Sequence, residues 1–384
     1  MLLNGAEILV QALRDEGVTD IFGYPGGALL EIFDALDKSP INNVLVRQEQ
    51  GAVHEASGYA RAKNTVGVCI ATSGPGATNL VTGIATAYMD SIPVVAITGQ
   101  VAKHLIGTDA FQETDITGIT TPITKHNILV QDAEDLPRIV AEAFYIARTG
   151  RPGPVLIDIP RDVSQQQVAV YEPWKHVDIR SYKPTVYGHA GMIKRAAKAI
   201  AEAERMVSVP ASDPHVVGML GTYGNQEAND LIRQSDVILA IGTRFDDRII
   251  NAPNLFAPDS FIIHVDVDPA EIGKNIVPDI PIVGDAKQVM LQLEDALQRK
   301  AESLVGCGYL EQAKGAPEPD RIVPKVLDKL SDLVDLENCF FTTDVGQHQV
   351  WAANYLKCEK PHQFISSCGL GTMGYGIPAA VGAQ

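Results

Sequence analysis

The sequence has few cysteines, fewer basic than acidic residues, and no long apolar run. Its five cysteines are scattered and show no C-x-x-C spacing, which argues against a disulfide framework or a zinc site and favours a reducing, cytoplasmic compartment. The 31 basic and 47 acidic residues give a net charge of -16, so nucleic acid and anionic membrane are not expected as main partners. No segment is apolar for long enough to cross a bilayer. The first residues have an Asn4 cap and helical spacing rather than signal-peptide character.

Apolar runs alternate with amphipathic helical patterns along most of the chain. Most of the runs are apolar throughout, as in parallel strands covered on both faces, and the alternation predicts an α/β protein with successive doubly wound parallel sheets. The predicted strands are "NNVLV", "VGVCIAT", "IPVVAIT", "GPVLIDIP", "SDVILAIGT", "FIIHVDVD", "IPIVGD" and "CFFTTD".

The length of 384 residues predicts two or three domains. Two stretches without helical or strand period, "QQQVAVYEPWKHVDIRSYKPT" and "KGAPEPDRIVP", mark the boundaries. We therefore expect a first domain over residues 1–168, a second over 186–300, and the start of a third over 320–384.

Three glycine-rich turns follow predicted strands and open helices. They are "FGYPGG" (residues 22–27), "ATSGPGATN" (71–79) and "DVGQHQ" (344–349). Ligands of doubly wound sheets bind beyond the carboxyl ends of the strands, where backbone N–H groups at a helix start can hold an anion or a cofactor edge. Each turn taken singly is also explained as a tight connection that needs glycine.

Acidic residues end several strands of the second predicted domain. "AIGTRFDDR" (240–248), "HVDVDP" (264–269) and the pair Gly284-Asp285 have this arrangement. An acid at a strand end can hold a ribose hydroxyl, as in dinucleotide folds. A solvated ion-pair cluster explains the first of these turns equally well.

One carboxylate, Glu49, stands where a strand meets a helix in "VLVRQEQGAVHEASGYARA". The simplest explanation is an acid that favours a helix N-terminus. A functional carboxylate is the alternative, and this stretch by itself does not decide between them.

Taken together, these segments resemble the thiamine-diphosphate-dependent enzymes, and within them the large catalytic subunit of acetolactate synthase. The resemblance covers nearly the whole chain in family order. It is carried by "FGYPGGA", "RQEQGAVHEASGYARA", "SGPGATN", "GTDAFQE", "GRPGPVLIDIPRDV", "GTRFDDR", "HVDVDPAEIGKN" and "GLGTMGYGIPAAVGAQ".

The resemblance implies a transferase of branched-chain amino-acid biosynthesis. Such an enzyme decarboxylates pyruvate and condenses the hydroxyethyl unit with pyruvate or 2-ketobutyrate. A related thiamine-dependent oxidase or carboligase, or an inactive fragment, is the alternative. The implied cofactors are thiamine diphosphate, Mg²⁺ and FAD. The implied partners are a second copy, in a homodimer or tetramer with the active site at the subunit interface, and a small regulatory subunit.

The resemblance also implies a role for particular residues. Glu49 matches the glutamate that hydrogen-bonds the aminopyrimidine and relays its proton, with burial at the strand end raising its pKa. The other residues matched to thiamine diphosphate are Tyr24, Pro25, Gly26, Gly27, Pro75, Asn79, Gly346, Gln347, His348, Gly371 and Met373. Those matched to FAD are Arg151, Gly221, Tyr223, Gly242, Arg244, Asp246, Asp266, Gly284 and Asp285. Those matched to the substrate pocket are Val101, Phe111, Gln112, Asp247, Arg248 and Arg161.

Some expected segments are absent. The "GDG…N" segment that would hold Mg²⁺ is expected beyond Gln384, so the chain is interpreted as truncated at its C-terminus. The second domain is interpreted as contracted after "AIAEAERMVSV", with a smaller contraction after "GCGYLEQAKG". Arg161 stands where the family carries lysine, which keeps the charge.

Overall fold

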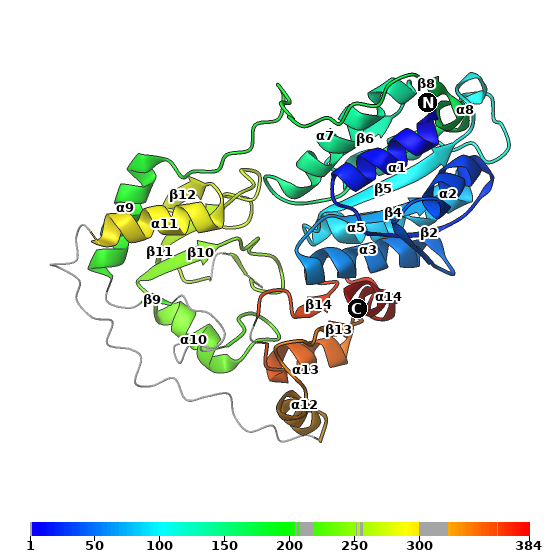
Figure 1. The fold of residues 1–384 in the computed structure, drawn as a ribbon. Helices are drawn as coiled ribbons and strands as arrows, with labels where there is room; N and C mark the ends of the chain where they lie inside the picture. Colours follow the sequence, from blue (N-terminus) through cyan, green and yellow to red (C-terminus); the bar gives the residue numbers. More distant parts are fainter. Residues whose placement is uncertain are drawn as a thin grey trace. The chain divides into compact units, whose positions relative to one another are not determined.

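A computed structural model describes residues 2–203, 206–207, 218–250, 252–253, 256–298, 322–358 and 360–384 (Figure 1). The chain divides into two compact units. The first comprises Met1–Tyr182, Asn338–Gln349 and Lys360–Gln384, and the second comprises Lys183–Glu337 and Val350–Glu359. Among the described residues, no helix is long and apolar enough to span a membrane.

The first unit is built on a six-stranded parallel sheet in the order β3-β2-β4-β5-β7-β6. Its strands are β2 (Asp20–Tyr24), β3 (Asn42–Leu45), β4 (Gly67–Ala71), β5 (Val94–Gln100), β6 (His126–Leu129) and β7 (Val155–Pro160). β4, β5 and β7 are buried along their whole length. This accounts for their uninterrupted apolar sequences, because helices cover both faces of a parallel sheet.

Successive residues of each strand point to opposite faces of this sheet. Val68 and Ile70 of β4 pack in one core, with α1 (Gly5–Asp15), α2 (Leu30–Asp37) and α7 (Leu136–Arg148). Cys69 and Ala71 of the same strand pack in the other core. That second core is covered by α3 (Glu49–Lys63), α4 (Pro75–Asn79), α5 (Val81–Met89) and α6 (Ile116–Thr120).

Short elements complete the first unit. A two-stranded antiparallel pair joins β1 (Leu3–Asn4) to β8 (Gln167–Val168), and α8 (Arg161–Gln165) follows β7. The 3-10 turns are η1 (Gly27–Leu29), η2 (Lys103–Leu105), η3 (Thr121–Ile123) and η4 (Ala133–Asp135). The predicted Asn4 cap is confirmed: its side chain accepts from Glu7 N, and Glu7 caps the Asn4 N–H in return.

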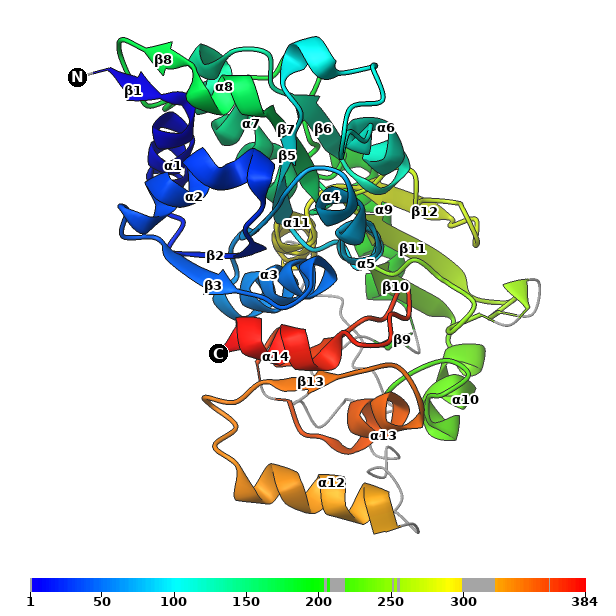
Figure 2. The same ribbon diagram turned by 90° about the vertical axis from the view of Figure 1, so that its right-hand side faces the viewer.

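The C-terminal segment of the first unit packs against α3. It holds the parallel pair β13 (Phe341–Thr343) and β14 (Phe364–Ser366), followed by α14 (Gly376–Ala383). α14 lies beside α3 (Figure 2). A Cβ on Gly58 would overlap the backbone of Ala379, and one on Gly382 would overlap the backbone of Glu55. These two glycines therefore allow the helix backbones to approach closely.

The second unit contains a four-stranded parallel sheet in the order β12-β11-β10-β9. The strands are β9 (Met206–Val207), β10 (Val237–Ile241), β11 (Phe261–Asp266) and β12 (Ile280–Val283). α9 (Ala190–Glu202) and α11 (Ala286–Gln298) share one core with it, and α10 (Gln226–Gln234) contributes to the other. α12 (Ile322–Leu333) and most of α13 (Gln347–Tyr355) also belong to this unit.

The predicted α/β class with parallel sheets is confirmed, and each predicted apolar run contains a strand. β6, β9, β14 and the β1–β8 pair were not predicted. Residues 169–189 form no helix or strand, although Tyr171, Ile179 and Tyr182 pack on the first core. The two predicted contractions fall at residues outside the described ranges. The predicted division into three domains stays a prediction.

Candidate functional site

Glu49 is the first residue of α3, at the carboxyl edge of the first sheet. Its Oε2 accepts a 2.9 Å hydrogen bond from Asn79 Nδ2, at the end of α4. Its Oε1 lies 3.4 Å from the point where a Cβ on Gly76 would stand. The side chain is partly exposed, so the predicted shielding from water is incomplete. The reason is that α3 begins at the open edge of the sheet and packs its later turns, rather than its first residue, into the core.

The "YPGG" turn packs against Thr72, and Thr72 also lies beside Gly76, which is next to the Glu49 carboxylate. Tyr24 ends β2 and is 40% exposed, and Pro25 is exposed beside it. A Cβ on Gly26 would overlap the side chain of Thr72, whereas one on Gly27 would point into open space. The Thr72 Oγ1 atom is buried and has no hydrogen-bond partner among the described residues. A buried hydroxyl without a hydrogen-bond partner, packed against a glycine that a side chain cannot replace, fits contact with the polar edge of a ligand.

Thr72 is a site residue that sequence reasoning missed. It lies inside the quoted "ATSGPGATN" motif, but threonine is an ordinary residue at a strand end and has no sequence signal of its own. Its role depends on the approach of Gly26, which belongs to another strand's turn. Only the folded structure brings the two together.

The loop after β5 carries three predicted pocket residues. Val101 begins it, and its N–H donates to Gln100 Oε1 at 2.8 Å. Phe111 is 88% exposed, and Gln112 has a left-handed backbone with φ of 61°. A Cβ on Gly74, which itself has φ of 61°, would come within 2.8 Å of the Gln112 carbonyl oxygen. The loop therefore packs on the "SGPG" turn that leads to Pro75, which is exposed at the start of α4.

Two predicted arginines of the first unit lie at different places, Arg161 at the carboxyl edge beside the end of β5 and Arg151 before β7. Arg161 starts α8, after β7, and its guanidinium is 4.0 Å from Glu31 Oε1. Arg151 donates from Nε to Ser91 Oγ at 2.9 Å and stacks on Tyr88 at 5.9 Å. These contacts place Arg151 beside the loop after α5. The glycines and acids predicted to share FAD with it belong to the second unit.

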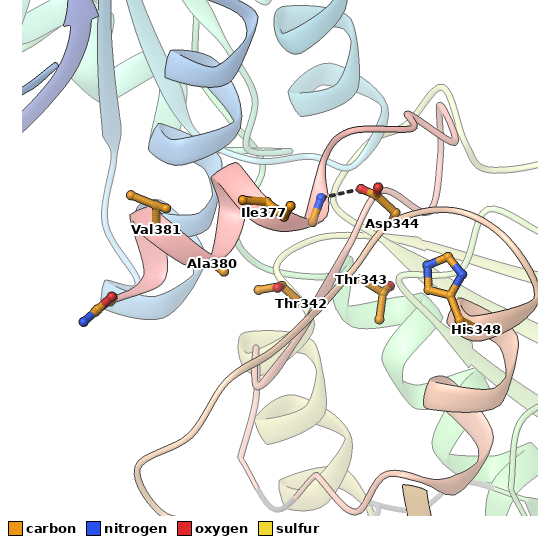
Figure 3. A pocket seen from close by; sticks show the side chains of 9 residues that line it. Thr342, Thr343, Asp344, His348, Ile377, Ala380 and Val381 are labelled. Atoms are coloured by element: carbon orange, nitrogen blue, oxygen red, sulfur yellow. Dashed lines mark hydrogen bonds between the residues drawn. The ribbon is translucent and has the colours of Figure 1, made fainter. Parts of the chain in front are cut away.

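Gly346 ends the turn after β13, Gln347 and His348 begin α13, and all three residues are exposed. A cavity of about 390 Å³ adjoins this turn and is shown in Figure 3. It is lined by Thr342, Thr343, Asp344 and His348 on one side and by residues of α14, including Ile377 and Ala380, on the other. Gly346 has φ of 144°, a conformation that side chains disfavour. Asp344 Oδ1 accepts from Gly376 N at 2.6 Å, so that carboxylate ties the turn to α14.

The "GLGTMG" segment runs between β14 and α14. Gly371 has φ of 72°, and Met373 is 79% exposed, without the packing that a buried side chain has. Thr372, in contrast, is buried and shares a 2.7 Å hydrogen bond with Thr86 of α5. The segment is thus anchored at Thr372 and presents Met373 to solvent.

Two ionisable residues of α3 lie against the C-terminal segment. Burial lowers the pKa of His54 to about 4, against the opposing effect of nearby Asp344. Burial raises the pKa of Glu55 to about 7. His54 is neutral at pH 7 and packs edge-on against Tyr375 at 5.1 Å. It therefore acts as a core residue of the α3–α14 contact.

In the second unit, Gly242, Asp266 and Gly284 lie along the carboxyl edge of the sheet. Gly242 follows β10 with φ of 62° and open space where a Cβ would point. Asp266 ends β11 nearly buried; burial raises the pKa of its carboxyl, which accepts from Asp268 N at 2.8 Å. Gly284 N donates to the Asp266 carbonyl at 3.0 Å. Asp285 caps α11 by accepting from Gln288 N at 3.0 Å.

The remaining predicted residues of the second unit cluster around one turn. Arg248 stacks on the Tyr223 ring at 5.6 Å and donates to its hydroxyl at 3.3 Å. A Cβ on Gly221 would overlap the Arg248 backbone. Arg244 is 3.5 Å from the Asp246 carboxylate, and Asp247 is exposed. Asp247 and Arg248 thus belong to the second unit, and their place in one pocket with Val101, Phe111 and Gln112 stays a prediction.

The first unit therefore brings together Glu49, Asn79, the "YPGG" turn, the "SGPG" turn and the loop carrying Gln112. A carboxylate fixed by an amide, an unpaired buried hydroxyl and close-approach glycines fit a flat heterocycle with polar edges. The described residues contain no cluster of three or more His, Cys, Asp or Glu side chains that could hold a metal ion.

Three segments of the chain match thiamine pyrophosphate enzyme domains. Residues 3–119 match the N-terminal TPP binding domain, 196–293 the central domain, and 344–384 the C-terminal TPP binding domain. The fold and the site thus define a thiamine-diphosphate-type enzyme, as the resemblance implied.

Sequence identity to known proteins identifies the family within this class of enzymes. The chain is 45% identical to the probable acetolactate synthase large subunit of Methanocaldococcus jannaschii, over the whole chain and 73% of that protein. It is 42% identical to the acetolactate synthase isozyme 3 large subunit of Escherichia coli, over the whole chain and 75% of that protein. The chain belongs to the acetolactate synthase large-subunit family. The first alignment spans 433 residues against 384 here, a difference of 49, in agreement with the predicted internal contraction.

Proposed function

We propose that this chain is an acetolactate synthase: it decarboxylates pyruvate and joins the resulting two-carbon unit to a second 2-ketoacid, pyruvate or 2-ketobutyrate. This is the first common step of valine and isoleucine biosynthesis. The observation that carries the proposal is the Glu49–Asn79 pair at the carboxyl edge of the sheet, within the matched N-terminal TPP binding domain. When bound, thiamine diphosphate supplies an electron sink for the reacting carbon.

Glu49 is proposed to exchange a proton with a ring nitrogen of the cofactor. Asn79 holds Oε2 at 2.9 Å, which fixes the plane of the carboxylate. Oε1 has no such bond to Asn79 and faces Gly76, where no side chain intervenes. A carboxyl with one oxygen fixed and one free can hold a proton at a defined point.

The glycine turns and Thr72 are proposed to bind the same ring. Gly26 and Gly76 pack directly against the side chain of Thr72, and the Thr72 hydroxyl would gain from the ring the hydrogen bond that it lacks among the described residues. Tyr24, Pro25, Gly27 and Pro75 are proposed to border the ring. Gly346, Gln347 and His348 are proposed to bind the diphosphate, with Gly371 and Met373 beside it, and Met373 is exposed for such a contact.

Mg²⁺ is proposed as a second cofactor, since the family resemblance implies it. This ion is usually held by one or two carboxylates together with phosphates, and the diphosphate would supply the phosphates. FAD is proposed for the carboxyl edge of the second sheet. Gly242 leaves open space there, and Asp266 ends β11 beside Gly284. Gly221, Tyr223, Arg244, Asp246 and Asp285 are proposed as further contacts, with Arg151 from the first unit.

The substrate is proposed to meet Val101, Phe111, Gln112 and Asp247, with the cationic side chains of Arg248 and Arg161 attracting its carboxylate. A second copy of the chain and a small regulatory subunit are proposed as partners, in a cytoplasmic complex. The "large subunit" in the relatives' names supports the regulatory partner.

The test is product formation from pyruvate by the full chain with thiamine diphosphate, Mg²⁺ and FAD. We expect acetolactate, and a loss of at least about a hundredfold in Glu49→Gln, since a positioned acid–base group contributes about 10²–10⁴. Asp20→Asn is the matched control: Asp20 also accepts from an asparagine amide, at 3.0 Å, but lies at the opposite end of β2. Acetyl phosphate and hydrogen peroxide as products would point to an oxidase instead. Absence of both turnover and cofactor binding would contradict the proposal.

A further inference from the structure

The loop between β5 and α6 (residues 101–115) has a strained backbone. Asp109 and Gln112 both have positive φ, 58° and 61°, which costs a non-glycine residue about 1–3 kcal/mol. Phe111 stands between them and is 88% exposed, so its direction is set by the loop backbone rather than by packing. The loop conformation therefore depends on hydrogen bonds rather than on packing of its side chains.

The Gln100 side chain contacts both ends of the loop. It is 4% exposed at the end of β5. Its Oε1 accepts from Val101 N at 2.8 Å, where the loop begins, and its Nε2 donates to Thr114 O at 2.8 Å, where the loop ends. One amide thus closes the loop at its base.

The amide can make these bonds in only one orientation, and Asp158 selects that orientation. Asp158 lies on β7 and is 1% exposed. Its Oδ2 accepts from Gln100 Nε2 at 3.1 Å, and its Oδ1 accepts from Thr98 Oγ1 at 2.7 Å. A flipped amide would face both the carboxylate and the Thr114 carbonyl with an oxygen, and would lose all three bonds.

We propose that Asp158 and Gln100 are positioning residues of the substrate pocket: Gln100 ties the two ends of the 101–115 loop, and Asp158 holds the Gln100 amide in the orientation that does so. Glu113 supports the same conformation from within, because its carboxylate accepts from the backbone N–H groups of Gly107, Thr108 and Ala110. The role of the loop in binding a 2-ketoacid rests on the proposed function. The holding of the loop by Gln100 and Asp158 does not.

Two measurements on the full chain test the proposal. Hydrogen exchange, read by mass spectrometry without cofactors, reports the loop backbone. Steady-state kinetics with pyruvate separates KM from kcat. Gln100→Met keeps the volume and removes every bond, and Gln100→Asn retains a buried amide that is one methylene too short to reach both ends. Asp158→Ala removes the orienting group, and Asp158→Asn keeps it, since its carbonyl oxygen can still accept from Gln100.

We expect exchange in residues 101–115 to rise about tenfold in Gln100→Met, Gln100→Asn and Asp158→Ala, the factor equivalent to about 1.4 kcal/mol for one net hydrogen bond. KM for pyruvate should rise by a similar factor, with a smaller change in kcat. Asp158→Asn should stay within about twofold of the parent chain in both measurements, and so should the remote control Asp20→Asn.

Unchanged loop exchange in a folded Gln100 variant would overturn the proposal. So would an Asp158→Asn variant that behaves like Asp158→Ala, since a charge rather than an orientation would then matter. If the parent chain makes no acetolactate, the proposed function fails. The exchange measurement still decides whether Gln100 and Asp158 hold the loop.

Discussion

The stability of the first unit should fall as the pH rises from about 4 to 7, because the folded chain keeps the proton of Asp158 in this range and the unfolded chain does not. Burial raises the pKa of this carboxyl from 3.8 to about 7, against the hydrogen bonds from Thr98 and Gln100 that lower it. Between these two values the folded chain keeps a proton that the unfolded chain has lost. Folding is then linked to proton uptake, and the free energy of unfolding falls with increasing pH.

The size of this effect follows from the shift. About three pH units at about 1.4 kcal/mol each give a total loss near 4 kcal/mol, with the stabilisation fully present below pH 3.8 and lost above pH 7. Asp158→Asn removes the titrating group and leaves the neighbouring hydrogen bonds in place. We therefore expect the variant to gain about 3 kcal/mol over the parent chain between pH 5 and pH 8.

Urea unfolding at pH 5, 6, 7 and 8, followed by far-UV circular dichroism, measures the two pH profiles. Exchange of the β5 and β7 amides would confirm that the transition belongs to the first unit. Glu55, whose pKa is also raised to about 7, titrates in the same window but is present in both chains, so its contribution cancels in the difference. Parallel stability profiles for the two chains would refute the reasoning.

Three further predictions concern the site and the C-terminal segment. Gly26→Ala should cost about 1–3 kcal/mol through overlap with Thr72 and weaken thiamine diphosphate binding in a calorimetric titration, while Gly27→Ala, with open space at its Cβ, should not lower the stability. Tyr375→Phe removes the 2.8 Å bond to Ser57 and should cost about 1 kcal/mol and speed proteolysis within residues 360–384; an unchanged digestion rate would contradict the anchoring role. Chelation of Mg²⁺ should abolish acetolactate formation, and added Mg²⁺ should restore it; full activity after chelation would exclude the metal.

Most strands were predictable from the sequence because buried strands consist of short apolar runs. β4, β5 and β7 are apolar throughout, since both of their faces are covered, and this pattern is typical of parallel strands between helices. β6 escaped prediction because His126 and Asn127 give it a mixed sequence at the edge of the sheet. The packing of α14 on α3 also escaped, because it depends on Gly58 and Gly382, which read as ordinary small residues.

The candidate site was predictable only in part. Motif order pointed to Glu49, Asn79 and the glycine turns, and the structure brings these to one edge of the sheet. Thr72 and Gln100 were not predicted, because each depends on contacts between segments distant in sequence or across a loop. Long-range hydrogen bonds of this kind leave no local pattern in a single sequence.

The central claim is that Glu49 exchanges the proton that activates the cofactor. Exchange of the thiazolium C2 proton for deuterium in bound thiamine diphosphate, followed by proton magnetic resonance after acid quench, measures this step without substrate. The account predicts rapid exchange on the parent chain and on Asp20→Asn, and a rate lower by at least about a hundredfold on Glu49→Gln at equal cofactor occupancy. Exchange on Glu49→Gln as fast as on the parent chain would contradict it.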